Sequence, residues 1–351
     1  MKNILNNIKI QAIAAYLPSK VLEMRSLADI YGEKTVETII QATGVERVHV
    51  AASDETSSDM CFEAAIMLIE EEGISRENID GLIFASQTSD YRLPATSIIL
   101  QDRLGLTKET VCFDLPYGCS GYIYGIFQAS LLISSGTCKN VLVLAGDTST
   151  KMINAKDRAQ RMVFGDCGTA TLVVKGNNTI GIHMGVDGSG YDKVIIPAGG
   201  SRIPSSEATQ LEFSDDEGNI RTQENLYMDG LSVFNFILQS GKSSINSLLE
   251  YMNWNKEDVN LFALHQGTSF TLRHLIKRLK VDPEKAPINI VNYGNTGPST
   301  IPLILCDMFH SNPEITSKWD KIIMCAYGVG LSWGSIACSL SETNIYKPKT
   351  K

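Results

Sequence analysis

Asp114-Leu-Pro-Tyr-Gly-Cys119-Ser-Gly-Tyr-Ile-Tyr-Gly125 is the stretch around which this chain is organised. Its pattern predicts the end of a strand, a glycine-rich turn, and a helix that begins at or just after Cys119. A thiol at a helix N-terminus faces unpaired backbone N–H groups and the positive end of the helix dipole, and both favour the thiolate. Cys119 is therefore our candidate nucleophile.

The segments around this stretch alternate between strands and helices. The helix after Cys119 carries Gly121, Gly125 and Ala129 at a spacing of four and is apolar almost all round, which predicts that it is buried with another helix against this stripe. We expect strands over 8–17, 79–86, 111–115 and 140–145, and helices over 26–42, 57–72 and 96–104. This alternation indicates an α/β fold in which the strands pair largely in parallel.

Three short patterns recur in the same order about 180 residues further along the chain. Glu77-Asn-Ile-Asp recurs at Glu257, Gly118-Cys-Ser-Gly at Gly294, and the hydrophobic run after Lys139 at Lys321. A nearly constant offset indicates two copies of one α/β unit, which we place at residues 1–178 and 179–351. The turns at Cys119 and Asn295 would then face each other and form one shared site.

Length and composition exclude several classes of protein. The 351 residues, 43% hydrophobic and 20% charged, can bury two cores or one large one, and the net charge of −8 argues against a general nucleic-acid-binding protein. The polar N-terminus does not resemble a signal peptide, and no run reaches the ~18 to 20 apolar residues of a membrane span. We therefore expect a cytoplasmic protein that acts neither on nucleic acid nor in a membrane.

Eight cysteines are scattered along the chain without any Cys-x-x-Cys pair. This spacing predicts reduced thiols rather than a disulfide framework or a metal site. We expect about seven of the eight to serve as small buried hydrophobic residues, with Cys119 as the exception.

The second copy offers two partners for the cysteine. His265 follows a hydrophobic strand over 261–264, and Asn295 occupies the turn that corresponds to the turn of Cys119. A thiol, an imidazole and a carboxamide at the ends of three elements form a plausible nucleophilic site. Two simpler interpretations stay open, because a histidine at a strand end is often structural and Asn-Thr-Gly is a common turn.

The order and spacing of these motifs resemble the β-ketoacyl-acyl-carrier-protein synthase III family, the initiating condensing enzymes of the thiolase-like superfamily. The resemblance spans nearly the whole chain. Its markers are Thr43-Gly-Val-Glu-Arg47, the Cys119 turn, Phe164-Gly-Asp166, Leu264-His-Gln266, Gly294-Asn-Thr296, Ser299-Thr-Ile-Pro302 and Tyr327-Gly-Val-Gly330-Leu-Ser-Trp-Gly334. The resemblance implies a five-layer αβαβα fold of two similar halves, the first carrying the cysteine and the second the histidine and asparagine, and it implies a homodimer.

The resemblance also implies a first reaction step. Cys119 would attack an acyl thioester, carried by coenzyme A or by acyl carrier protein, and hold the acyl group. The oxyanion would be bound by the backbone N–H of Cys119 and by that of Val329, which lies between Gly328 and Gly330 in a glycine-rich loop.

A second step follows from the same resemblance. His265 and Asn295 would bind the thioester carbonyl of malonyl-acyl-carrier protein and stabilise the enolate that forms as carbon dioxide leaves. The related synthase that does not decarboxylate relies on a glutamate base, which has no obvious substitute here. We therefore favour decarboxylative condensation to a 3-oxoacyl product, with no metal and no cofactor beyond the thioester substrates.

Two positions near the expected substrate entrance depart from the family. The segment before Thr43-Gly commonly holds a Trp and an Arg that clamp the adenine of coenzyme A, and the matching residues here are Thr38 and Ala42. Either the acyl donor is carried by acyl carrier protein, or coenzyme A is held differently. Leu93 matches the residue that gates the acyl pocket across the dimer interface, and its modest size would permit more than an acetyl group.

A third departure concerns the docking of the carrier protein. An Arg that often follows the His-Gln pair is replaced by Phe270. The nearby Arg273, Lys277 and Arg278 on the following helix are the alternative candidates for carrier docking.

Gly330-Leu-Ser332-Trp-Gly334 matches the Gly-x-Ser-x-Gly pattern of serine hydrolases. That mechanism needs a histidine further along the chain, and none follows Ser332. The residues after Ser332 also have the pattern of a strand, where the hydrolase turn needs a helix. We therefore exclude a serine hydrolase.

Two other functions stay open. An enzyme with the same Cys and His could transfer an acyl group to a hydroxyl or amine of a specialised metabolite without decarboxylation. A non-catalytic subunit could pair with an active paralogue, although such subunits commonly lose the nucleophile, which this chain keeps.

Overall fold

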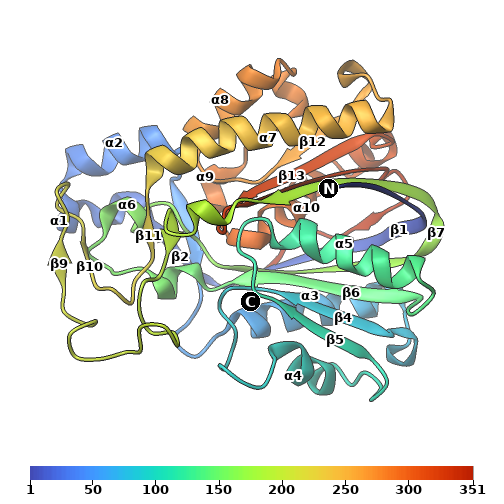
Figure 1. The fold of residues 1–351 in the computed structure, drawn as a ribbon, viewed down its shortest axis with the longest axis horizontal. Helices are drawn as coiled ribbons and strands as arrows, with labels where there is room; N and C mark the ends of the chain where they lie inside the picture. Colours follow the sequence, from blue (N-terminus) through green and yellow to red (C-terminus); the bar gives the residue numbers. More distant parts are fainter. Residues whose placement is uncertain (351) are drawn as a thin grey trace.

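Five layers of alternating helices and sheets make up the protein (Figure 1). The computed structural model describes residues 1–350. Two helices, α5 (Gly121–Ser134) and α10 (Thr300–Ser311), pack in the middle between the sheets. The outer helices are α7 (Gly230–Met252) and α8 (Ser269–Leu279) on one side and α3 (Ser57–Glu72) and α4 (Thr96–Arg103) on the other. This arrangement confirms the predicted αβαβα fold.

The strands form two connected sheets. The first has the order β5 (Val111–Leu115), β4 (Gly81–Ala85), β6 (Asn140–Asp147) and the first part of β7 (Cys167–Val186). The second has the order β12 (Leu261–Leu264), β13 (Ile322–Gly328), β14 (Ser332–Cys338) and the last part of β7. β1 (Lys2–Leu17) pairs with β7 on its other side. The predicted division between residues 178 and 179 falls inside β7, the strand that both sheets share.

The direction of pairing differs from the sequence prediction. β4 pairs in parallel with β5 and β6, and β12 with β13, but β7 is antiparallel to β1, β6 and β14, and β13 is antiparallel to β14. The expectation of largely parallel pairing is therefore wrong. Only residues 329–331 connect β13 to β14, and so short a connection cannot return the chain to the start of a parallel strand.

One predicted helix is broken. Gly32, with a φ of +84°, separates α1 (Ala28–Tyr31) from α2 (Glu33–Thr43), and Met24–Leu27 is a 3-10 turn, so the single helix expected over 26–42 is wrong. A positive φ favours glycine and interrupts the helical backbone. The strand expected over 8–17 is present but begins earlier, at Lys2.

The remaining elements are short. They are β2 (Lys20–Glu23), β3 (Arg47–Val50), α6 (Arg158–Arg161), β8 (Val194–Ile195), β9 (Phe213–Ser214), β10 (Ile220–Arg221), β11 (Tyr227–Met228), α9 (Ile290–Tyr293), β15 (Asn344–Ile345) and β16 (Lys349–Thr350). Across residues 1–350, no helix combines the length and the apolar character that a membrane crossing requires.

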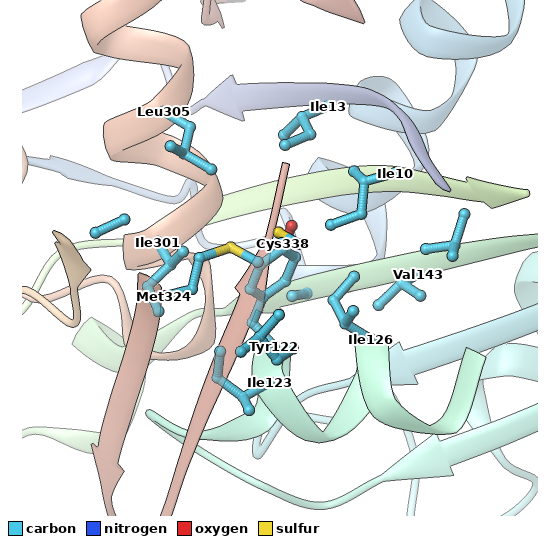
Figure 2. Packing of buried hydrophobic residues seen from close by; sticks show 14 of the residues in the cluster. Ile10, Ile13, Tyr122, Ile123, Ile126, Val143, Ile301, Leu305, Met324 and Cys338 are labelled. Carbon is cyan, nitrogen blue, oxygen red and sulfur yellow. The ribbon is translucent and has the colours of Figure 1, made fainter. Parts of the chain in front are cut away.

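Alternating side chains of the strands build the layers. Val143 of β6 faces the middle layer, whereas its neighbour Leu144 packs on the side of α3, as expected from the period of two along a strand. Figure 2 shows the middle layer, where Tyr122, Ile123 and Ile126 of α5 lie near Val143, Met324 and Ile301.

The small residues of α5 face both a sheet and the start of another helix. A Cβ added at Gly125 would lie 2.8 Å from Cγ1 of Val143, whereas one at Gly121 would lie 3.3 Å from Cβ of Pro298 and 3.4 Å from Cβ of Ala85. Pro298 lies in the 3-10 turn Gly297–Ser299 that leads into α10. The prediction that this helix is buried is confirmed, and the prediction that a helix packs against its small-residue stripe holds at Gly121 only. The close approach of α5 to β4 and β6 fixes the position of the turn that carries Cys119.

Candidate active site

One cavity of about 480 Å³ lies where strands of both sheets end. Cys119, His265 and Asn295 all line it, so the structure brings together the three residues selected from the sequence. The other walls are mostly apolar and come largely from the segments around β8, β11 and α7. They include Met152, Val163, Phe164, Leu226, Met228 and Phe234.

Cys119 lies in the turn between β5 and α5, just before the helix begins at Gly121. Its own backbone N–H and that of Val329 lie close enough to its sulfur to stabilise a thiolate. The backbone passes so close on one side that a Cβ added at Gly328 would lie 2.9 Å from the Sγ atom. The sulfur is therefore held between the start of α5 and the loop that follows β13.

Burial dominates the acidity of this thiol. It raises the pKa of Cys119 to about 12, the Asp147 carboxylate adds to the increase, and the N–H groups of Cys119 and Val329 oppose it. The N–H groups at the helix terminus therefore favour the thiolate as predicted, but burial outweighs them. At neutral pH the thiol is protonated.

His265 is buried at the end of β12. Its backbone N–H donates to the carbonyl of Cys325 at 2.8 Å, its ring Nδ1 lies 2.6 Å from the hydroxyl oxygen of Thr300, and its ring packs edge-to-face against Tyr327 with centroids 5.8 Å apart. Burial lowers the pKa of His265 to about 3, so the imidazole is neutral. Its Nε2 atom is left for a ligand in the cavity.

Asn295 is held by three hydrogen bonds. Its backbone N–H donates to Val163 at 2.8 Å, its carbonyl accepts from Gly165 at 3.1 Å, and its side-chain Oδ1 accepts from the N–H of Gly297 at 3.0 Å. Because Oδ1 is occupied, the orientation of the carboxamide is fixed. Within residues 1–350 its NH₂ group has no protein acceptor, so it can donate to a ligand.

The sequence analysis missed Asp147, a carboxylate in the wall of the cavity. It ends β6, is only 1% exposed, and its Oδ1 accepts from the backbone N–H of Gln87 at 2.7 Å and from the hydroxyl of Ser86 at 2.9 Å. Burial raises the pKa of Asp147 to about 7. The sequence did contain a signal for this residue, because Asp147 is a polar residue at the end of an apolar strand. Ligand sites often lie at the carboxyl ends of strands in α/β sheets.

The glycine-rich loop lies only partly at the site. Gly328 and Val329 line the cavity, whereas Gly330 is exposed and does not. The neighbouring Ser332 is fully buried and bonded to Ser120 and to the carbonyl of Val329. With no histidine among these partners, the exclusion of a serine hydrolase is consistent with the structure.

The predicted entrance residues are distributed over the surface. Arg273, Lys277 and Arg278 are exposed on α8, and Phe270, also on α8, lines the cavity. Leu93 is 82% exposed and does not contact this chain's cavity, so its proposed role as a gate stays a prediction that requires a second subunit.

Thr38 and Ala42 are both exposed on α2. Thr38 lies in a separate surface groove together with Lys34 and Arg158. Neither residue reaches the cavity that holds Cys119.

For metal binding, residues 1–350 contain no group of three or more His, Cys, Asp and Glu side chains that could hold an ion together.

Known proteins resemble this chain over nearly its whole length. The family description "3-Oxoacyl-[acyl-carrier-protein (ACP)] synthase III" matches residues 113–188, and its C-terminal counterpart matches residues 249–340. The chain is 32% identical to a putative 3-oxoacyl-[acyl-carrier-protein] synthase 3 of Campylobacter jejuni, over 97% of this chain and 96% of that protein. It is 33% identical to a β-ketoacyl-[acyl-carrier-protein] synthase III of Caldanaerobacter subterraneus, over 93% and 96% respectively.

The likeness extends to solved structures. A 3-oxoacyl-(acyl-carrier protein) synthase from Burkholderia xenovorans LB400 superposes with a TM-score of 0.91 at 30% identity, covering 100% of this chain and 99% of that one.

Proposed function

Because the chain belongs to the β-ketoacyl-acyl-carrier-protein synthase III family of condensing enzymes, we propose that Cys119 carries the acyl group while His265 and Asn295 activate the malonyl thioester. The family and the condensing activity predicted from the sequence are confirmed. The observation that supports the residue roles is that these three side chains, from three separate segments, line one largely apolar cavity.

In the first step, the sulfur of Cys119 attacks the carbonyl carbon of an acyl thioester. The bond from that carbon to the donor sulfur breaks, and the thiol proton passes to the departing sulfur. The N–H groups of Cys119 and Val329, which lie close to Sγ, are suited to bind the oxyanion of the tetrahedral intermediate. The apolar walls exclude water and so protect the acyl-enzyme from hydrolysis.

In the second step, malonyl-carrier protein loses carbon dioxide and leaves an enolate. The neutral imidazole of His265 and the NH₂ group of Asn295 are suited to donate to the enolate oxygen, because neither group is consumed as an acid. The enolate carbon attacks the carbonyl of acyl-Cys119, the C–S bond breaks, and the released thiolate takes a proton from solvent. The product is a 3-oxoacyl thioester on the carrier.

The carrier protein would dock on α8, beside the cavity. Arg273, Lys277 and Arg278 are exposed there and offer positive charge to an acidic carrier, and Phe270 adds an apolar contact with 51% of its surface exposed. Reversing the charge of these three residues is expected to raise KM for malonyl-carrier protein while leaving that for malonyl-coenzyme A unchanged.

The enzyme would act as a homodimer paired along β5. This strand ends its sheet with only β4 as a neighbour, and an open strand edge is a template for a second chain. Phe113 on β5 and Ile98 on α4 are exposed apolar residues, and Leu93 could then reach the partner's cavity. Light scattering after gel filtration would measure the mass, and a monomer at micromolar concentration would contradict the proposal.

The cytoplasm is the proposed compartment. All eight cysteines are free in the structure, and free thiols are typical of a reducing compartment.

Mass spectrometry of the intact enzyme tests the roles proposed for the residues. Incubation with a panel of acyl-coenzyme A and acyl-carrier-protein donors is expected to add one acyl group, and Cys119→Ala is expected to abolish this adduct. Release of labelled carbon dioxide from malonyl-carrier protein then tests the condensation. Acyl transfer to a hydroxyl or amine acceptor without this release would favour the alternative reaction.

A further inference from the structure

Two hydrogen bonds in series join the turn of the nucleophile to the glycine-rich loop. The hydroxyl oxygen of Ser332 lies 2.6 Å from the carbonyl oxygen of Val329 and 2.7 Å from the hydroxyl oxygen of Ser120. Ser120 is 1% exposed and Ser332 is fully buried, so water does not compete for either hydroxyl. The two serines lie 212 residues apart and belong to opposite halves of the chain.

The direction of both bonds follows from counting donors. A carbonyl oxygen can only accept, so the single hydrogen of Ser332 is donated to Val329. Ser332 can then only accept from Ser120, which donates its own hydrogen. The chain therefore runs from Ser120 through Ser332 to Val329.

This chain ends on the residue that supplies an oxyanion donor. Ser120 directly follows Cys119 and Ser332 begins β14. The loop backbone packs on the cysteine, since a Cβ at Gly328 would lie 2.9 Å from Sγ, and the Val329 N–H is close enough to that sulfur to stabilise negative charge there. Val329 stands between Gly328 and Gly330, so no side chain of a neighbouring residue fixes the direction of its backbone. A bond to the carbonyl of Val329 fixes the peptide plane that follows this residue, and the two torsions of Val329 link that plane to the one that carries its N–H.

We propose that Ser120 and Ser332 are positioning residues that hold the Val329 N–H in line with the oxyanion. This inference rests on the proposed role of Cys119 as the carrier of the acyl group. The serine of the Gly330-Leu-Ser-Trp-Gly334 pattern thereby has a function in the acyl-transfer site, although it is not a nucleophile.

The rate of acyl loading on Cys119, followed by rapid quenching and intact mass, tests this proposal. Ser332→Ala is expected to lower the maximal loading rate about tenfold, because a misaimed oxyanion donor loses part of its effect, and to leave KM for the acyl donor unchanged. Ser120→Ala is expected to slow loading less, about threefold, because Ser332 can still reach Val329. The double variant should load no more slowly than Ser332→Ala, since Ser120 acts only through Ser332.

Matched variants separate positioning from general packing. Ser332→Thr and Ser120→Thr keep the hydroxyl and should load at close to the normal rate. Ser130→Ala removes another fully buried serine of α5, whose hydroxyl donates to Ile126 at 2.7 Å away from the cavity, and should not slow loading.

Three outcomes would overturn the inference. A normal loading rate in folded Ser332→Ala would be sufficient to overturn it. So would a double variant whose loading rate falls by the product of the two single reductions. Absence of any acyl adduct on the unmodified enzyme would overturn the proposed function and this inference with it.

Discussion

The Nδ1 atom of His265 lies 2.6 Å from the hydroxyl oxygen of Thr300, the first residue of α10. The same hydroxyl is 3.4 Å from the carbonyl of Gly297, at the outer limit for a hydrogen bond. We predict that the hydroxyl donates its hydrogen to Nδ1 and not to the more distant Gly297 carbonyl, which places the ring proton on Nε2, the nitrogen left for a substrate. The neutral imidazole can then donate to a thioester carbonyl.

Thr300→Val should slow condensation and spare acyl loading. Valine has the shape of threonine but cannot donate to Nδ1, and the loss of one net hydrogen bond corresponds to about a tenfold lower rate of carbon dioxide release at saturating malonyl-carrier protein. Thr300→Ser keeps the donor and should restore most of the rate. Nitrogen NMR of the labelled imidazole reports the tautomer, and an unchanged spectrum in Thr300→Val would refute the assignment.

The reactivity of Cys119 should rise with pH without levelling off near neutrality. Burial raises the pKa of its thiol to about 12, so the thiolate fraction grows about tenfold for each pH unit between 7 and 10. We expect the rate of carbamidomethylation by iodoacetamide to follow this increase when the Cys119 peptide is quantified by mass spectrometry. A plateau below pH 9 would contradict the raised pKa. Cys119→Ser is the control, because its peptide has no thiol at this position and should not be alkylated.

Local sequence was sufficient to locate the turn that carries Cys119, the candidate nucleophile. The strand expected over 111–115 is β5, and α5 begins two residues after Cys119, because the strand run, the glycine turn and the apolar helix each have a local signal. The prediction that His265 and Asn295 act together depended on the family resemblance. The spacing of the two residues alone was also compatible with purely structural roles. The fold, and the grouping of Cys119, His265 and Asn295 around one cavity, were therefore predictable in outline.

The features that the sequence did not predict depend on contacts between distant segments. Gln87 and Asp147 lie 60 residues apart and meet only because β4 and β6 are neighbours in a sheet. The pKa of Cys119 was misjudged for the same reason, since tertiary burial outweighs the two N–H donors. Hydrophobic periodicity identifies strands but carries no information on the direction in which they pair, which explains the wrong expectation of parallel sheets.

Gly328→Ala should greatly slow acyl loading while leaving the protein folded. A Cβ at this position would lie 2.7 Å from Cβ of Cys119 and 2.9 Å from its Sγ, so the loop after β13 must shift and carry the Val329 N–H with it. We expect loading to fall roughly a hundredfold, as for the loss of an oxyanion donor. Gly188→Ala is the control, because a Cβ there meets no atom within 4 Å. Equal loading by the two variants would show that the loop has no such constraint.

Asp147 should make the stability of the enzyme depend on pH near neutrality. Burial raises the pKa of this carboxyl from 3.8 to about 7, so the folded state binds the proton more tightly than the unfolded state. The resulting stabilisation is complete below about pH 4 and is lost as the pH rises through 7. A shift of this size corresponds to roughly 4 kcal/mol between those limits.

Asp147→Asn removes the titration while keeping an acceptor oxygen for Gln87 and Ser86. Urea unfolding between pH 5 and 8 should therefore show a smaller loss of unfolding free energy in this variant than in the unmodified enzyme. Asp187→Asn is the control: hydrogen bonds from Ser189 lower the pKa of that exposed carboxyl, so its contribution to stability changes only below pH 4. If Asp147→Asn and the unmodified enzyme showed the same pH dependence, the pKa of Asp147 would be equal in the folded and unfolded states, and the prediction would be wrong.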